Sequence, residues 1–430
     1  MKYLYRCVAG ILFFLISLSL LAQQSSHNGA PKYAPADGEK LLIMGQDLGA
    51  VGGLDDYSDG YVDHLNHVPA GITTYTGFPS LTGLTDLANW GSGDVNAQAY
   101  VEDETFDHSL IVFGLHLVDQ LGSIISGGSD SQLDILGGWI KSQERPVFLR
   151  IGYEFDGSWN HYDPGQFKEA WIYIVHHFDD LEIRNVSYVW QAYGGNTPNI
   201  GRWYPGDRYV NWMGYSHFNE PNPGANILAF AELHDKPVMI AEATPKVDLK
   251  VGDGAAHWTS WYAPLYEKIY SQNRIKALAY INVNWDSQSM WQGQGWGDSR
   301  VQVNEVVMEN WQMEIQKAPW VLASDSLFEL LDYQKWQDMD VTEISDIQSL
   351  DDKVQILSTP DGLLIRSVEN SRIDEIRIWD MNGRLRYVSE TASPIFEIPA
   401  HLFSGVAAVV LQVRMGETTV RKKAMITKMN

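Results

Sequence analysis

Short apolar runs rich in β-branched and aromatic residues recur between residues 40 and 281, with longer amphipathic stretches between them. Two of these stretches, residues 167–178 and 258–270, have the composition and length of helices. Strands that alternate with helices predict a parallel sheet. The apolar runs are residues 40–44, 71–75, 109–113, 146–149, 186–190, 212–215, 237–241 and 275–281.

The number of these runs predicts the fold class. Eight strand–helix units within roughly 250–300 residues are what a (β/α)8 TIM barrel requires. We therefore expect an α/β barrel domain over residues 39–322. The active site of such a barrel lies at the carboxyl ends of its strands, so residues that follow the apolar runs are the candidates for chemistry.

The pattern changes after residue 322. Residues 323–352 are acidic and carry no glycine, which indicates a linker. From residue 353 to 430 short alternating segments predict strands, and Asp361-Gly362, Asn382-Gly383 and Gly416 are hairpin signals between them. We expect a small all-β sandwich here.

The first 22 residues have the pattern of a secretory signal peptide. Lys2 and Arg6 precede an apolar segment that ends near Ala22, and residues 23–38 read as a disordered lead-in. The alternative is a retained N-terminal anchor. Cys7 is the single cysteine, so cleavage would leave a secreted protein without disulfides or cysteine chemistry.

Composition narrows the class of partner. The formal net charge of −23 opposes binding to nucleic acid or to an anionic membrane surface. Sixteen Trp and 21 Tyr indicate either a large aromatic core or a surface that stacks on flat ligands. We find no nucleophile elbow and no phosphate-binding glycine motif, and we expect no cofactor and no metal.

The acidic loop that holds Asp55, Asp56, Asp59 and Asp63 lacks EF-hand spacing, so a solvated loop is favoured over a calcium site.

Two glutamates stand where apolar runs end. Glu154 follows the fourth run, and Glu242 follows the seventh. Glycoside hydrolysis needs one carboxyl group to protonate the leaving oxygen and a second to attack the sugar or to activate water. Burial beside Tyr153 and Phe155 would raise the pKa of Glu154 and suit it to the acid role. The alternative is two salt-bridged or solvated carboxylates.

Further residues around these strand ends are candidates for contact with a sugar. Arg150 stands four positions before Glu154, so it is expected on the same side and able to hold a carboxylate through two hydrogen bonds. Each of these residues could equally be structural. The candidate substrate-binding residues are Arg150, Tyr153, Trp159, His116, Gln191, His217, Trp285 and Trp296, with Trp291 as a further aromatic candidate.

The segment "LRIGYEFDGSWN" resembles the acid/base segment of glycoside hydrolase family 26, a group of retaining endo-glycanases on (β/α)8 barrels. Arg150, Glu154, Gly157 and Trp159 match its pattern. "KPVMIAEATP" is similar to the family's nucleophile strand, which implies that Glu242 is the nucleophile and Glu154 the acid/base. Residues 280–304 look like the family's last strand and the loop after it, with Trp285 at a sugar subsite.

Two positions depart from the mannanase branch of that family. Tyr153 stands where a His usually precedes the acid/base, and Asp156 stands where an Asn precedes the Gly. The "YEFDG" form looks more like the β-1,3-xylanase branch, which makes β-1,3-xylan the leading substrate. The alternatives are a β-mannanase, a hydrolase of a red-algal galactan such as carrageenan, and a non-catalytic polysaccharide-binding barrel.

The C-terminal part resembles a type IX secretion sorting tail, carried by "IWDMNGRL" and "LFSGVAAVVLQV". The resemblance implies an outer-membrane secretion machinery as a partner and a secreted or cell-surface location. The alternative is a small carbohydrate-binding domain. We expect a monomer.

Overall fold

The computed structural model describes residues 29–333 and, towards the C-terminus, residues 354–359, 362–367, 371–380, 385–390, 393–399, 408–415 and 418–425. The predicted signal peptide and most of the predicted linker lie outside the described residues. Within the described residues, no helix is both long enough and apolar enough to cross a membrane.

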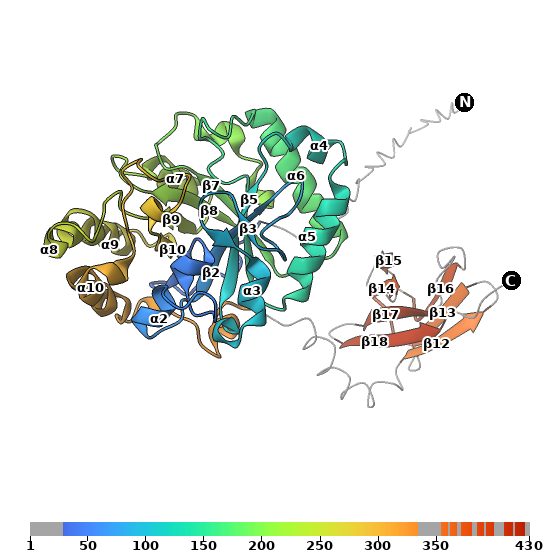
Figure 1. The fold of residues 1–430 in the computed structure, drawn as a ribbon. Helices are drawn as coiled ribbons and strands as arrows, with labels where there is room; N and C mark the ends of the chain where they lie inside the picture. The colour runs from blue at the N-terminus through green and yellow to red at the C-terminus, as the bar shows by residue number, and fades with distance from the viewer. Residues whose placement is uncertain are drawn as a thin grey trace, which may run out of the picture.

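Eight parallel strands close into a barrel (Figure 1), as the sequence predicts. Each strand pairs with the next, and the last pairs with the first through the register Leu41↔Ala277 to Gly45↔Ile281. All eight predicted runs are strands of this barrel. A short strand β11 (Trp320–Val321) adds to the start of the first strand. The barrel strands are β1 (Lys40–Gly45), β2 (Gly71–Gly77), β5 (Leu110–His116), β6 (Val147–Ile151), β7 (Val186–Ala192), β8 (Trp212–His217), β9 (Val238–Ala243) and β10 (Ile275–Ile281).

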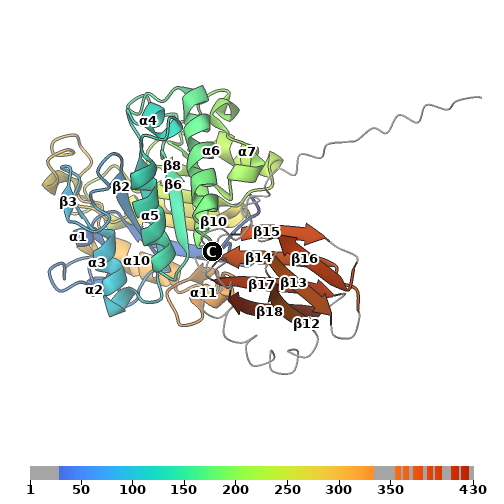
Figure 2. The same cartoon turned by 90° about the vertical axis from the view of Figure 1, so that its right-hand side faces the viewer.

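Helices surround the barrel, and α5 and α6 lie side by side along its outer face (Figure 2). A hairpin of β3 (Ala88–Asn89) and β4 (Asp94–Val95) is inserted between β2 and β5. A π-helix over Trp258–Tyr262 precedes α9. The helices are α1 (Leu48–Val51), α2 (Tyr61–Leu65), α3 (Ala97–Glu102), α4 (Leu121–Ile125), α5 (Asp130–Ser142), α6 (Pro164–Asp180), α7 (Ala225–Leu233), α8 (Gly254–His257), α9 (Ala263–Ser271), α10 (Glu305–Ile315) and α11 (Leu327–Leu330).

Helix α6 shows how local sequence sets these elements. Asp163 caps its N-terminus by accepting hydrogen bonds from the backbone N–H groups of Gly165 and Gln166, and Pro164 occupies the first turn. The apolar residues recur at helical spacing and face the barrel. They are Phe167, Ala170, Trp171, Ile174, Val175 and Phe178, all buried.

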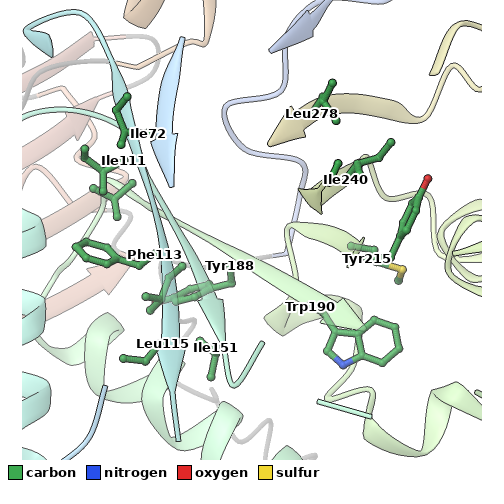
Figure 3. Close-up of a cluster of buried hydrophobic side chains, with 14 of the residues drawn as sticks. Ile72, Ile111, Phe113, Leu115, Ile151, Tyr188, Trp190, Tyr215, Ile240 and Leu278 are labelled. Carbon is green, nitrogen blue, oxygen red and sulfur yellow. The ribbon is translucent and has the colours of Figure 1, made fainter. Parts of the chain in front are cut away.

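Two apolar layers build the barrel core. The layer between strands and helices holds side chains from several strands, among them Ile111, Phe113 and Leu115 of β5 (Figure 3). The layer inside the barrel holds the alternate side chains, such as Leu110 and Val112 of the same strand. This period-two alternation follows from the pleat, which points successive side chains to opposite faces.

The interior side chains change from apolar to polar toward the carboxyl ends of the strands, which we call the mouth. Phe148 of β6 and Val189 of β7 lie in the interior apolar layer. Two residues further along, the same inward positions hold Arg150 and Gln191, and both are fully buried. Buried polar groups of this kind must find partners inside the protein. The polar layer below the mouth is therefore a hydrogen-bonded network.

The opposite end of the barrel is closed by chain from outside the predicted domain. Trp212 Nε1 donates to Lys32 O at 2.8 Å, and Asn211 Nδ2 donates to Ala30 O at 2.6 Å. Tyr33 packs against Phe148, with ring centroids 6.2 Å apart. The expectation of a disordered lead-in over residues 23–38 is thus wrong for residues 29–38.

The predicted end of the barrel domain also needs correction. Leu327 of α11 and Leu331 are buried within the same interior cluster, although we placed residues 323–352 in a linker. The Phe328 and Tyr333 rings contact each other at 5.8 Å. The compact unit therefore extends from residue 29 to residue 333, because both flanking segments cover apolar surface at the base of the barrel.

The described C-terminal strands form two antiparallel sheets, as predicted for a small β domain. One sheet has the order β12-β13-β16 and the other β15-β14-β17-β18. Their core includes Val354, Ile365, Ile376 and Leu411. The strands are β12 (Val354–Thr359), β13 (Gly362–Ser367), β14 (Glu375–Asp380), β15 (Leu385–Glu390), β16 (Ile395–Pro399), β17 (Ala408–Met415) and β18 (Thr418–Met425).

Candidate active site

A β-bulge in β9 turns Glu242 into the mouth. Against β8, Tyr215 pairs with Ile240 but the next residue, Ser216, pairs with Glu242. The pairing with β10 shifts over the same residues. Ala241 lies in the interior cluster, so strict alternation would point Glu242 away from it. The extra residue lets Ala241 and Glu242 both face inward.

Two donors hold one oxygen of the Glu242 carboxylate. Arg150 Nη1 lies 2.6 Å from Glu242 Oε1, and the Tyr75 hydroxyl donates to the same oxygen at 2.9 Å. Burial, with the nearby Glu242 charge, raises the pKa of Tyr75 well above its usual range, so its hydroxyl stays a donor. Oε1 is thereby occupied, and Oε2 is the oxygen left for chemistry.

Arg150 is fully buried, and its guanidinium also donates to Gln191 Oε1 at 3.0 Å and to Thr73 Oγ1 at 3.1 Å. The Tyr75 and Tyr153 rings lie 5.1 and 5.4 Å from it. We expected two hydrogen bonds from Arg150 to one carboxylate. The structure shows a single one to Glu242, because the second amino group points at β2.

Glu154 stands three residues beyond the end of β6, in a tight turn. Its φ of 52° is left-handed, and so is that of Gly152. Asn160 Nδ2 donates to the carbonyl oxygens of Tyr153 and Glu154 at 3.0 and 2.9 Å, which holds this turn. The strand alternation that we extended from Arg150 to Glu154 therefore does not apply. The turn, rather than the strand, aims the Glu154 side chain.

The Glu154 carboxyl group is buried and accepts a 2.6 Å hydrogen bond from the Ser216 hydroxyl at Oε1. Burial raises its pKa well above the usual range, and the Glu242 charge raises it further. Ser216 and Arg150 act in the opposite direction but do not outweigh these two causes. Glu154 and Glu242 thus sit in different environments, one favouring the protonated form and the other bound to a cation.

The remaining predicted residues divide into buried and exposed ones. Gln191 is fully buried and bonds to Arg150 and, through Nε2 at 3.1 Å, to Ser216 Oγ. It therefore supports the site from below and does not face a ligand. Tyr153 is half-buried beside Arg150. Trp159 is 56% exposed, and its ring meets Tyr193 edge-on at 5.3 Å.

Trp285, which the sequence predicts at a sugar subsite, is only 3% exposed. Its Nε1 donates to Ser299 Oγ at 2.9 Å, which also accepts from Thr244 two residues after Glu242. Its ring packs against Trp291 and Trp296, both half-buried. The Lys246 ammonium group lies over the Trp296 ring, 5.0 Å from the ring centroid. Residues 296–300 thus hold Trp285 beside strand β9, which carries Glu242.

The two candidate histidines end strands β5 and β8, which β6 and β7 separate, and they differ in environment. His116 is exposed at the end of β5. His217, at the end of β8, is buried, and its Nδ1 has no hydrogen-bond partner within the described part of the chain. Burial and the Lys268 charge lower the pKa of His217 to about 3, so the imidazole is neutral.

The acidic loop does not gather its carboxylates. Asp63 Oδ2 accepts from the backbone N–H groups of Gly53 and Gly60, and Asp59 pairs with His64 at 2.8 Å. Among the residues that the structure describes, no group of three or more His, Cys, Asp or Glu is arranged to hold a metal ion.

Three residues near the mouth were not named from the sequence. Tyr75 and Ser216 lie within strands, where they read as ordinary strand residues. Trp90 is 45% exposed and lies in the turn of the β3–β4 hairpin. This hairpin contacts the loop after β10, because Met290 N donates a hydrogen bond to Gly91 O at 2.8 Å. The usable signal for the first two was an inward position near the end of a barrel strand.

Two buried glutamates at the mouth of a (β/α)8 barrel, each held by its own hydrogen-bond donors, are the arrangement that glycoside hydrolases use. Residues 130–286 match the family model "Glycosyl hydrolase family 26". A beta-1,3-xylanase TXYA from Vibrio sp is 30% identical over 325 residues, 68% of each chain. A beta-1,3-xylanase from Alcaligenes sp is 30% identical over 341 residues, 72% of this chain and 70% of the other.

Solved structures agree on the fold. A GH26 beta-mannanase from Bacteroides ovatus superposes with a TM-score of 0.50 at 16% identity, over 69% of this chain and 93% of that one. The catalytic domain of a Bacillus sp. GH26 endo-beta-1,4-mannanase gives 0.51 at 16% identity, over 72% and 96%. The chain belongs to glycosyl hydrolase family 26 and is an endo-acting glycoside hydrolase.

Proposed function

We propose that the protein cleaves β-1,3-linked xylan with retention of configuration. Glu242 is the nucleophile and Glu154 the general acid and then base. The observation that carries these roles is the contrast between the two carboxyl groups. Arg150 and Tyr75 both donate to Glu242 Oε1, whereas burial raises the pKa of Glu154. The substrate rests on the two beta-1,3-xylanase relatives and on Tyr153 and Asp156 in the acid/base segment.

The two steps follow from these positions. Glu242 Oε2 attacks the anomeric carbon while the Glu154 proton passes to the departing glycosidic oxygen, so the C–O bond of the polymer breaks as the glycosyl–enzyme ester forms. Glu154, now ionised, takes a proton from water. That water attacks the same anomeric carbon and displaces Glu242. Two inversions give net retention.

Exposed aromatic rings at the mouth are proposed to carry the sugar chain. Trp159, in the loop after β6, and Trp90, in the loop after β2, present open indole faces. Both loops leave the carboxyl ends of barrel strands, where the substrate must lie. Tyr153, His116, His217 and Trp296 are proposed to contact the sugars nearer the two glutamates, and Trp285 to support them from beneath.

A hydrolysis panel tests the proposal. The full chain and its Glu242→Ala and Glu154→Ala variants are incubated with β-1,3-xylan, β-mannan, lichenan, laminarin and carrageenan, and product sizes are followed. Xylo-oligosaccharides that first appear as the β-anomer, and that are absent with Glu242→Ala, support it. Products from mannan or carrageenan alone would show that β-1,3-xylan is not the substrate. An initial α-anomer would show that the enzyme inverts the anomeric configuration and does not retain it.

Glu154→Ala has its own expected signature. Loss of a general acid costs about 10²–10⁴-fold with a leaving group that needs protonation. An activated aryl xyloside, whose leaving group does not, should lose far less in the glycosylation step. Equal losses on both substrates would contradict the acid role of Glu154.

We also propose that the enzyme acts outside the cell. This rests on the signal-peptide pattern of residues 1–22 and on the resemblance of residues 353–430 to a type IX sorting tail. Expression in a bacterium that has this secretion system, with and without residues 334–430, tests it. If the full chain is exported and the chain without residues 334–430 stays inside the cell, the proposal is supported. Unchanged export, with loss of binding to xylan, would favour a carbohydrate-binding domain.

A further inference from the structure

A continuous chain of hydrogen bonds links the two glutamates beneath the mouth. Arg150 Nη1 donates to Glu242 Oε1 at 2.6 Å and to Gln191 Oε1 at 3.0 Å. Gln191 Nε2 donates to Ser216 Oγ at 3.1 Å, and Ser216 donates to Glu154 Oε1 at 2.6 Å. Arg150, Gln191 and Ser216 are all fully buried, so bulk solvent does not reach these side chains.

Arg150 sets the donor-to-acceptor direction of these hydrogen bonds. A guanidinium can only donate, so the Gln191 atom that faces it must be the carbonyl oxygen. The amide nitrogen of Gln191 then faces Ser216 and donates to its oxygen. The Ser216 hydroxyl keeps one proton of its own, and Glu154 Oε1 is its acceptor.

We propose that Ser216, oriented by Gln191, is a positioning residue that places the catalytic proton of Glu154 on Oε2. This inference rests on the proposed acid role of Glu154. A proton on Oε1 would point at Ser216 and leave the serine hydroxyl without an acceptor among the described residues. A buried donor without a partner is costly. The proton therefore occupies Oε2, the oxygen free to meet the leaving group.

The same contact adjusts the acidity of Glu154. Ser216 donates to the carboxylate form, which lowers the pKa against the larger raising effects of burial and of the Glu242 charge. Removing the hydroxyl should raise that pKa. The other charged or titratable groups that interact with Glu154 are Arg150, Asp156, Tyr153 and Tyr193.

Ser216→Ala and the near-isosteric Ser216→Cys, whose thiol is a weak donor, test the role. We expect kcat/KM on β-1,3-xylo-oligosaccharides to fall about tenfold or more, and on an activated aryl xyloside to change less than about threefold. The alkaline limb of the pH profile should move to higher pH, since it reports loss of the proton from Glu154. Ser216→Thr keeps the hydroxyl and should restore the wild-type profile.

Ser187→Ala is the matched control. Ser187 is an equally buried serine on β7, but its hydroxyl donates to Lys32 O at the base of the barrel. It should change neither the leaving-group dependence nor the pH limb.

The outcomes separate this inference from the proposed function. If Glu154→Ala shows the leaving-group signature and the Ser216 variants lose both substrates equally with an unmoved limb, the positioning role is overturned alone. If Glu154→Ala itself lacks the signature, the acid assignment fails and the inference falls with it. Folding of each variant is checked by its melting temperature.

Discussion

Arg150 Nη1 and Glu242 Oε1 lie 2.6 Å apart and join two strands that are not neighbours in the sheet. Arg150 belongs to β6 and Glu242 to β9, with β7 and β8 between them. The guanidinium thus crosses the inside of the barrel. The pair is buried, so each charge depends on the other for compensation.

Arg150→Met should lower both stability and activity. Removing one partner leaves a buried carboxylate without its cation, which costs about 3–5 kcal/mol in the free energy of unfolding. Denaturant unfolding with matched kinetics checks this. The double variant Arg150→Met/Glu242→Leu should regain part of the stability and none of the activity. If Arg150→Met were as stable as the wild type, the interpretation that Arg150 compensates the buried charge of Glu242 would be wrong.

Tyr75→Phe should reduce kcat about tenfold and leave the fold intact. The variant removes one of the two donors to Glu242 Oε1, and a hydrogen bond to a charged group contributes about 1.5–3 kcal/mol. Tyr100→Phe is the matched control, because Tyr100 is also fully buried but its hydroxyl has no partner among the described residues. Equal kinetics of the two variants would remove Tyr75 from the catalytic arrangement.

Glu154→Gln should stabilise the protein at neutral pH while it abolishes the acid function. The folded state raises the pKa of Glu154 above its unfolded value, chiefly by burial. Folding therefore binds a proton, and stability falls as pH rises above the unfolded pKa of about 4.5. The gain in melting temperature should be clear at pH 7 and near zero at pH 4.

The exposed Glu232→Gln serves as the comparison for that measurement. Glu232 pairs with Arg274 on the surface, where such contacts contribute little. Its melting temperature should stay close to wild type at both pH values. A gain for Glu154→Gln that is equal at pH 4 and pH 7 would contradict the raised pKa.

A chain that starts at residue 39 should be much less stable than one that starts at residue 29. It loses the burial of Tyr33, which amounts to about 1.5–3 kcal/mol, and leaves donors of Asn211, Trp212 and Lys276 without acceptors at the base. A drop of about 10 °C or more in melting temperature is expected. Melting temperatures within a degree or two of each other would show that the segment is dispensable.

Trp159→Ala and Trp90→Ala should weaken binding of long substrates more than turnover of short ones. Each removes an exposed indole at the mouth, and one aromatic contact of about 1.4 kcal/mol corresponds to a tenfold rise in KM. Kinetics on β-1,3-xylo-oligosaccharides of increasing length measure this. Leu233→Ala, on the outer surface of α7 and 77% exposed, is the control. Unchanged KM values at every length would exclude the two rings as sugar platforms.

The sequence predicts the architecture well because the barrel repeats one local pattern. Each of the eight apolar runs became a strand, and β12 pairs with β13 and β14 with β15, as the two hairpin signals predict. Local spacing also placed Arg150, Glu154 and Glu242 at strand ends. These features depend on neighbours in the chain, which periodicity reads directly.

The tertiary structure alone decided how those residues are used. The bulge at Ala241 and Glu242, the left-handed turn at Glu154, and the choice of Tyr75 and Ser216 as partners depend on strands far apart in sequence. Burial of Trp285 and closure of the base by residues 29–38 have the same origin. No local pattern encodes such contacts, because they arise when the closed barrel brings inward positions of separate strands to one level.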